Sequence, residues 1–239
     1  MPPELSVVLP AHNEVGVIAS VIDDVVATAR RLVGGTRGAG VQVIVVDDAS
    51  TDGTSEALDE LAARHAEVTV VHLLDNVGHG PALRAGWERA TGEWVAHLDS
   101  DAEVPADQLD RLWAVRADAD LVLGVRTQRT DTTVRRFVTW TLKSVARIAS
   151  GRRLRDANTP CKIVRRSSLK DALTLMPPDA FAPSVLLAVA VARRHGRVAE
   201  VEVVTRPRSH GTSWLVPTTL ARGCARSMVD TVRVAWRAR

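Results

Sequence analysis

Aromatic side chains are scarce in this sequence, which contains no tyrosine, two phenylalanines and six tryptophans. Proteins that bind single-stranded nucleic acid stack the bases on aromatic side chains. The 28 arginines alone would suit phosphate binding. The shortage of stacking platforms nevertheless argues against a nucleic-acid-binding protein.

Cysteine and long apolar runs are also lacking. The two cysteines, Cys161 and Cys224, are too few for a disulfide framework, and neither has a histidine at the spacing of a zinc site. The N-terminal residues do not have the pattern of a signal peptide. The longest apolar run, residues 185–192, is far shorter than the roughly 18 residues that span a bilayer. We therefore expect a cytoplasmic protein, or one bound at the inner face of the cell membrane.

Charge is divided unevenly along the chain. Residues 1–119 contain 8 basic and 20 acidic side chains, whereas residues 120–239 contain 23 basic and 8 acidic ones. The acidic half could hold a cation and would repel nucleic acid, and the basic half could meet phosphates or an anionic membrane. Solvated surface arginines are the alternative explanation for any single arginine, but they do not explain the separation of sign.

Short runs of β-branched residues alternate with amphipathic segments, a pattern typical of βαβ units around a mostly parallel sheet. The sequence predicts one α/β domain with strands at residues 5–9, 41–46, 68–73, 94–98, 121–125, 161–164 and 198–204. It predicts helices from residue 18 to near residue 34, at 54–65, 81–90, 107–116 and 134–150, on both sides of Pro177, and from about residue 217.

Acidic residues stand at the ends of two predicted strands: Asp47 and Asp48 end the second, and Asp99 and Asp101 end the fourth. Ligands of open α/β sheets bind beyond the carboxyl ends of the strands. Clustered carboxylates need compensation by a cation or by hydrogen-bond donors. Mg²⁺ and Mn²⁺ favour carboxylate oxygens and are often completed by phosphates, so we expect a metal-diphosphate site. For Asp48 and Asp52, capping of the next helix is the alternative.

Four segments in the first half resemble motifs of the family 2 glycosyltransferases with the A-type fold. They are SVVLPAHNE at residues 6–14, VIVVDDASTDGT at 43–54, NVGHGPALRAG at 76–86 and HLDSDAEVP at 97–105, the last resembling the DxD metal motif. A lone DxD is common by chance. Four such segments in order and at family-like spacing make a strong signal.

The resemblance continues in the second half, where it points to one branch of the family. LVLGVR at residues 121–126, DANTPCKIVRR at 156–166 and RPRSHGTS at 206–213 look like segments of the dolichol-phosphate-mannose synthase and polyprenyl-phosphate glycosyltransferase branch. The likeness implies a Rossmann-like nucleotide-sugar and metal-binding half at residues 1–105. It implies a basic acceptor-binding half at residues 106–239, both within one glycosyltransferase domain.

The resemblance also implies roles for individual residues. Asp48 would bind the base in a pocket shaped by Pro10, Ala11 and Glu14, and Ser100 lies between the DxD carboxylates. The metal, Mg²⁺ or Mn²⁺, would be held by Asp99, Asp101 and Glu103, where related synthases carry Gln in place of Glu103. The diphosphate or the acceptor phosphate would meet a basic cluster that comprises Arg126, Arg208 and one of Arg135 or Arg136, with Ser213 nearby.

The acceptor decides whether a general base is needed. A lipid monophosphate is already an anionic nucleophile, whereas a hydroxyl acceptor needs a base, for which Asp156 is the candidate. A turn or strand cap is the alternative role for Asp156. His12, His79 and His97 match no metal-ligand spacing, so we expect loop or packing roles for them.

The last predicted helix is strongly amphipathic. Its arginines gather on one side, and apolar residues occupy the opposite side, among them Met228, Val232 and Trp236. This helix could lie on an anionic membrane, or it could pack on the domain or on a homodimer partner.

We therefore expect an inverting hexosyltransferase that moves a sugar from a GDP- or UDP-sugar to a polyprenyl phosphate. The alternatives are a transferase of the same fold acting on a soluble hydroxyl acceptor, such as a natural product or polysaccharide, and a nucleotide-sugar-binding protein without turnover.

Overall fold

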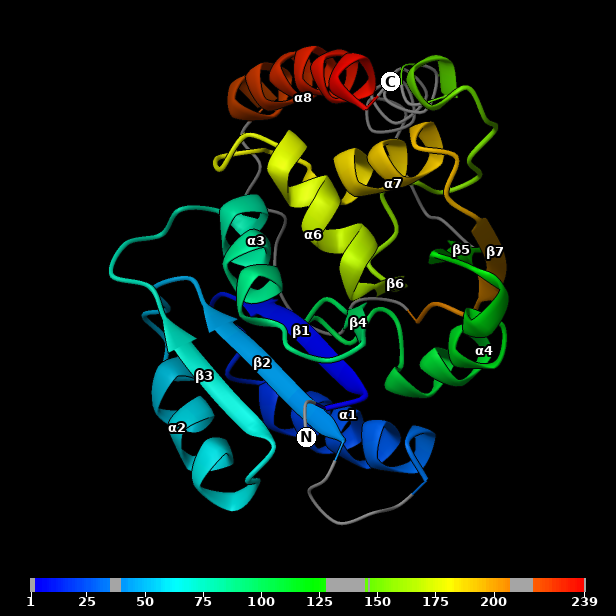
Figure 1. Cartoon of the computed structure of the whole chain (residues 1–239). Helices are drawn as coiled ribbons and strands as arrows, with labels where there is room; N and C mark the ends of the chain where they lie inside the picture. The colour runs from blue at the N-terminus through cyan, green and yellow to red at the C-terminus, as the bar shows by residue number, and fades with distance from the viewer. Residues whose placement is uncertain (1–2, 35–39, 128–144, 146, 207–216, 239) are drawn as a thin grey trace.

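A single mixed β-sheet runs through the whole computed structural model (Figure 1), which describes residues 3–34, 40–127, 145, 147–206 and 217–238. The sheet has seven strands in the order β3-β2-β1-β4-β6-β5-β7. The strand pairs β1–β2, β1–β4, β2–β3 and β5–β7 are parallel, and β6 is antiparallel to both of its neighbours. The mostly parallel α/β sheet predicted from the sequence is confirmed.

In the first half, strands and helices alternate along the chain: β1 (Leu5–Ala11), α1 (Ile18–Leu32), β2 (Val41–Asp47), α2 (Thr54–Arg64), β3 (Val68–His72), α3 (His79–Arg89) and β4 (Trp94–His97). All seven agree with the predicted elements to within about two residues. This agreement follows from the continuous apolar strands, which are buried on both sides by helices.

The second half is less regular. It contains η1 (Ala106–Gln108), α4 (Leu109–Ala114), η2 (Arg116–Asp118), β5 (Leu121–Arg126), a helical segment at residues 147–150, β6 (Lys162–Arg165), α6 (Arg166–Leu175), α7 (Pro183–Arg193), β7 (Val198–Val203) and α8 (Pro217–Arg237). The single helix predicted at residues 107–116 is wrong in detail, because 3₁₀ turns precede and follow a short α-helix there. Most of the helix predicted at 134–150 lies outside the described residues.

Alternate strand residues face two separate apolar cores. Val7 of β1 belongs to the core that contains α1, α2 and α4, and Val8 belongs to the core that contains α3, α6 and α7. The sheet is therefore a middle layer between two layers of helices, as Figure 1 shows.

Helix α7 is buried all round, from Pro183 to Ala192. A helix that is apolar on every side needs cover on every side. Helix α8 supplies that cover, because Val234, Ala235 and Ala238 belong to the same core cluster as α7. In Figure 1, α8 lies at the outer edge of the molecule, beyond α7 and away from β1 to β3.

Candidate active site

The loops that follow β1, β2 and β3 are joined to one another by hydrogen bonds. The Asp48 carbonyl oxygen lies 2.8 Å from His12 Nδ1, and the Asn13 side chain accepts a bond from Thr51 N at 2.8 Å. Asn76 Nδ2 lies 3.1 Å from His12 Nε2. These loops therefore form one connected rim at the carboxyl end of the sheet, where ligands of such folds bind.

The Asp48 side chain is 3% exposed and holds the loop before α3. Its two carboxylate oxygens accept bonds from Val77 N at 2.7 Å and Gly78 N at 2.9 Å. Asp48 N donates to the carbonyl of Ala11 at 2.9 Å. The predicted nucleotide-binding residues Ala11 and Asp48 are thus neighbours, and contact of Asp48 with a base stays a prediction.

The remaining predicted pocket residues lie on the same rim. Pro10 lies within β1, opposite Val46 of β2 in the parallel register. Glu14 N donates to Thr54 Oγ1 at 2.9 Å, which joins the first loop to the start of α2. Asp52 accepts a bond from Thr54 N at 3.1 Å, but Gly53 is the N-cap of α2 and no side chain makes a cap bond there, so the capping role that was its alternative is not observed.

Asp99 lies between two histidines immediately after β4. Its Oδ1 is 3.1 Å from His97 Nε2 and 3.7 Å from His79 Nε2. The ligand atoms of these three residues all lie within 4.8 Å of one another, and one carboxylate oxygen with two imidazole nitrogens suits a divalent first-row cation. Sequence reasoning missed this group, since His79 and His97 are 18 positions apart and match no ligand spacing.

The electrostatic environment of Asp99 favours its charged form. Burial acts to raise the pKa of Asp99, but His79, the bond from His97 and the charge of Arg126 together hold that pKa below its usual value. Burial lowers the pKa of His97 to about 4, so this imidazole is neutral at pH 7. His97 Nδ1 is buried without a partner among the described residues. Buried N–H groups are left unpaired more rarely than buried acceptors, so we place the proton on Nε2, directed at Asp99. In this tautomer His97 orients Asp99, and the Asp99 carboxylate and His79 are the members of the group left to ligate a cation.

Asp101 and Glu103 continue the same turn. Asp101 is 4% exposed, and its Oδ1 accepts a bond from Glu103 N at 2.9 Å, while Ser100 is also buried. Ala102 between them has a φ of 58°, in the left-handed region that alanine rarely adopts. Asn13 and Ala49, with φ of 55° and 54°, show the same conformation in the loops after β1 and β2. Positive φ at non-glycine residues is thus concentrated at this rim, as is common at functional sites.

Arg126, at the end of β5, is a residue of the basic half that contacts an acidic residue of the first half. Its guanidinium donates to both oxygens of Asp156 at 2.9 and 3.2 Å and lies 3.7 Å from Glu103 Oε1. Burial acts to lower the pKa of Arg126, but the Asp156 bonds and the charges of Glu103 and Asp99 hold it above the usual value. The structure therefore places Arg126, Glu103, Asp156 and Asp99 in one cluster.

Lys162 lies fully buried behind this cluster, and sequence reasoning missed it. Its Nζ donates to the carbonyl oxygens of Ala157 at 3.3 Å and Ser184 at 3.2 Å. Burial lowers its pKa to about 7, although Asp156 and Asp99 act to raise it. A single lysine inside an apolar strand was the only signal available.

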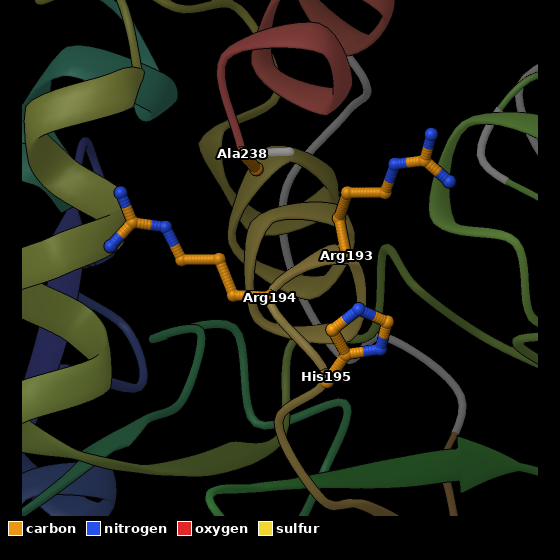
Figure 2. Close-up of a pocket in the computed structure, with 4 residues that line it drawn as sticks. All are labelled: Arg193, Arg194, His195 and Ala238. Carbon is orange, nitrogen blue, oxygen red and sulfur yellow. The ribbon is translucent and has the colours of Figure 1, made fainter.

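Four predicted phosphate-binding residues cannot be placed against this cluster. Arg135, Arg136, Arg208 and Ser213 lie outside the described residues. An open pocket elsewhere is lined by Arg193, Arg194, His195 and Ala238. Figure 2 shows the two guanidinium groups pointing away from one another, so they do not converge on one ligand. The candidate site is therefore the strand-end cluster.

The fold and the strand-end carboxylates define an α/β protein whose candidate site lies at the carboxyl ends of its parallel strands. The sequence profile of Glycosyl transferase family 2 matches residues 6–173, and the chain belongs to this family. A relative from Pectobacterium carotovorum subsp. carotovorum, an undecaprenyl-phosphate 4-deoxy-4-formamido-L-arabinose transferase, is 30% identical over 211 residues. The match covers 87% of this chain and 62% of that relative, so this chain spans about three fifths of the relative's length.

Two solved structures share the fold. Glucosyl-3-phosphoglycerate synthase from Mycobacterium tuberculosis, in complex with Mn²⁺, UDP and glucosyl-3-phosphoglycerate, superposes with a TM-score of 0.67 at 22% identity, covering 98% of this chain and 80% of that one. A mannosyltransferase from Pyrobaculum calidifontis, in complex with GDP-Man and Mn²⁺, gives 0.60 at 19% identity, covering 100% and 74%. The predicted glycosyltransferase A-type fold is confirmed. Among the described residues, no helix has the length and apolar character needed to cross a membrane.

Proposed function

We propose that this protein transfers a sugar, with inversion, from a UDP- or GDP-sugar to a polyprenyl phosphate. The observation that carries the proposal is the meeting of Asp99 and Glu103 from the acidic half with Arg126 from the basic half. A site with carboxylates on one side and a buried guanidinium on the other suits a cation bound to a diphosphate. The name of the Pectobacterium relative supports the lipid phosphate as the acceptor class.

The donor would lie across the rim, with its base near Pro10, Ala11, Glu14 and Asp48. Asp99, Asp101 and Glu103 would hold Mg²⁺ or Mn²⁺, with His79 as a further ligand because it is more than half exposed and lies beside Asp99. The bound ion would neutralise charge on the departing nucleoside diphosphate. Arg126 would share that task as a fixed, planar donor whose orientation is set by Asp156.

The pairing of Asp156 with Arg126 favours a phosphate acceptor over a hydroxyl acceptor. A carboxylate that accepts two bonds from a guanidinium orients that guanidinium and is poorly placed to remove a proton. A lipid monophosphate is anionic at neutral pH and needs no base. Attack on the anomeric carbon from the side opposite the leaving diphosphate would invert its configuration. Arg135, Arg136, Arg208 and Ser213 remain candidates for holding the acceptor phosphate.

A polyprenyl phosphate resides in a membrane, so the proposal places this protein at the inner face of the cell membrane while it acts. A homodimer, which the sequence left open for the last helix, is the other arrangement to be tested.

The test is incubation with a panel of UDP- and GDP-sugars and Mn²⁺, with and without a short polyprenyl phosphate, measuring nucleoside diphosphate release and the glycosylated lipid. We expect release that depends on the lipid and is reduced at least 100-fold in Asp101→Asn, because removing groups that stabilise transition-state charge costs on the order of 100-fold or more. Asp107→Asn, an exposed acidic residue of η1, is the matched control and should keep full activity. Release that needs a hydroxyl acceptor, or donor binding without turnover, would contradict the proposal.

A further inference from the structure

Helix α8 has a buried face that packs on the rest of the domain. Cys224, Ser227, Thr231, Val234 and Ala235 are all buried. Their spacing of three, four, three and one places them on one side of a helix, and that side covers α7. The sequence pattern placed Met228, Val232 and Trp236 on a single apolar side, opposite the arginines. The structure divides that side, because Val232 and Trp236 are exposed.

The exposed apolar residues form a stripe of their own, which we call the outer stripe. It consists of Ala225, Val229, Val232 and Trp236, and the last three are 49%, 58% and 70% exposed. Steps of four, three and four residues keep these side chains on one line along the helix. Exposed valines and a tryptophan in line are costly in water unless another apolar phase covers them.

A row of arginines runs beside the outer stripe. Arg222, Arg226, Arg233 and Arg237 are all exposed and lie within about 60° of one another around the helix. The acidic groups that face this row are Asp179, paired with Arg226, and the buried Asp230, 3.9 Å from Arg226 and 3.8 Å from Arg233. Arg222 and Arg237 have no acidic partner among the described residues. The face keeps an excess of positive charge next to an apolar line.

We propose that this face of α8 docks on an anionic lipid bilayer, with the outer stripe in the headgroup region and the arginine row on anionic headgroups. Interfacial helices combine an apolar stripe, often with tryptophan, and flanking basic residues that meet anionic lipids. Tryptophan suits the boundary because its ring is apolar and its N–H is polar.

A second apolar contact lies near the C-terminal end of α8. Ile148 is 82% exposed on the helical segment 147–150, and its neighbour Ala149 belongs to the same core cluster as Val234 and Ala235. Figure 1 shows this segment beside the end of α8, at the same outer edge of the molecule. Two exposed apolar contacts at one edge fit a flat surface better than a narrow groove.

Charge favours a bilayer over a second copy of this chain. The acidic side chains are concentrated in residues 1–119, far from α8 in the sequence and in Figure 1. A copy that offered them to the arginine row would bind head to tail, which gives an open-ended assembly unless the rotation closes. An anionic bilayer offers negative charge and an apolar phase together.

The test is co-sedimentation with vesicles that contain no polyprenyl phosphate, so its outcome does not depend on the proposed transfer. We expect the wild type to bind phosphatidylglycerol–phosphatidylcholine vesicles at least tenfold more strongly than pure phosphatidylcholine, and less strongly as salt is raised. The double variant Val232→Ser/Trp236→Ser should lower binding at least tenfold, and so should Arg222→Gln/Arg237→Gln. All substituted side chains are exposed, so the melting temperature should not change.

Matched controls lie outside α8 and the segment 147–150. Leu74→Ser removes an apolar side chain that is 98% exposed, and Arg64→Gln removes a surface arginine of α2, and both variants should bind like the wild type. Absence of binding to anionic vesicles at low salt would overturn the proposal. Equal loss in the control variants would also overturn it, as would a stable dimer that the Val232→Ser/Trp236→Ser change dissociates.

Discussion

The pKa of Lys162 depends strongly on the surroundings of this side chain. It is fully buried, and it joins the segment after Asp156 to the start of α7 through the carbonyl oxygens of Ala157 and Ser184. Burial lowers its pKa to about 7, whereas an unfolded chain gives lysine a pKa of about 10.4. Between these values the unfolded state binds more protons, so stability must rise with pH.

Replacing Lys162 by Met should remove this dependence. Over pH 7 to 8.5 we expect the free energy of unfolding of the wild type to gain about 1.5 kcal/mol relative to Lys162→Met, since a fully unequal proton count gives about 1.4 kcal/mol per pH unit. The window ends at pH 8.5 because burial raises the pKa of Cys161 to about 12, which acts in the opposite direction at higher pH. Urea unfolding at several pH values measures the difference. Lys170→Met, at an exposed position of α6, should run parallel to the wild type, and a parallel curve for Lys162→Met would refute the assignment.

At the residue scale, the acidic residues of the site could be predicted from the sequence, but the residues that contact them could not. Asp99 and Asp101 were recognisable because they directly follow an apolar strand. The histidines beside Asp99 were not, because His79 comes from the start of α3 and only the folded chain brings it there. The hydrogen bond from Arg126 to Asp156 joins residues 30 positions apart, so no local sequence pattern could predict it.

At the scale of elements, the start of α3 is fixed by a close approach of backbone to backbone. A Cβ atom at Gly80 would overlap the carbonyl oxygen of Ala180 and lie 2.9 Å from that of Phe181. Gly223 in α8 approaches the same loop, but the three atoms nearest to a Cβ there all belong to the Phe181 ring, at 2.6 to 2.8 Å. Backbone cannot move aside as a side chain can.

Gly80→Ala should therefore destabilise the protein by about 1 to 3 kcal/mol, the usual cost of forcing extra volume into a packed site. Gly223→Ala should cost clearly less, because the ring can rotate and alanine favours a helix by up to about 1 kcal/mol over glycine. Urea unfolding of the two variants and the wild type makes the comparison. Equal losses for the two variants would show that the Ala180 carbonyl does not limit this contact.

Elements with a strong apolar period were predictable, and the remainder depended on tertiary contacts. The strands and helices of residues 5–97 follow from their own patterns, since β1, β2 and β4 are mostly apolar and buried, and β3 at the sheet edge is rich in valine. The orientation of β6, antiparallel to both β4 and β5, has no local signal in the sequence. The exposure of Val232 and Trp236 likewise depends on which side of α8 meets α7.

At the scale of the whole molecule, the strand-end site and the outer face of α8 are separate surfaces. None of the residues of the outer stripe has a described bond to Asp99, Glu103 or Arg126. The double variant Val232→Ser/Trp236→Ser should therefore bind UDP or GDP with Mn²⁺, in the absence of membranes, within about twofold of the wild type. Asp101→Asn should lose at least tenfold in the same calorimetric titration, about 1.4 kcal/mol. A loss shared by both variants would show that the two surfaces are coupled.

The antiparallel pairing of β4 with β6 limits how the two parts of the chain can move relative to each other. Four residue pairs, from Trp94 with Arg165 to His97 with Lys162, unite the negatively and positively charged parts of the chain in one continuous sheet. A hinge between those parts would have to tear this ladder, with its buried backbone groups left unpaired. We therefore expect the sheet to stay rigid between these two parts of the chain when a ligand binds at its edge.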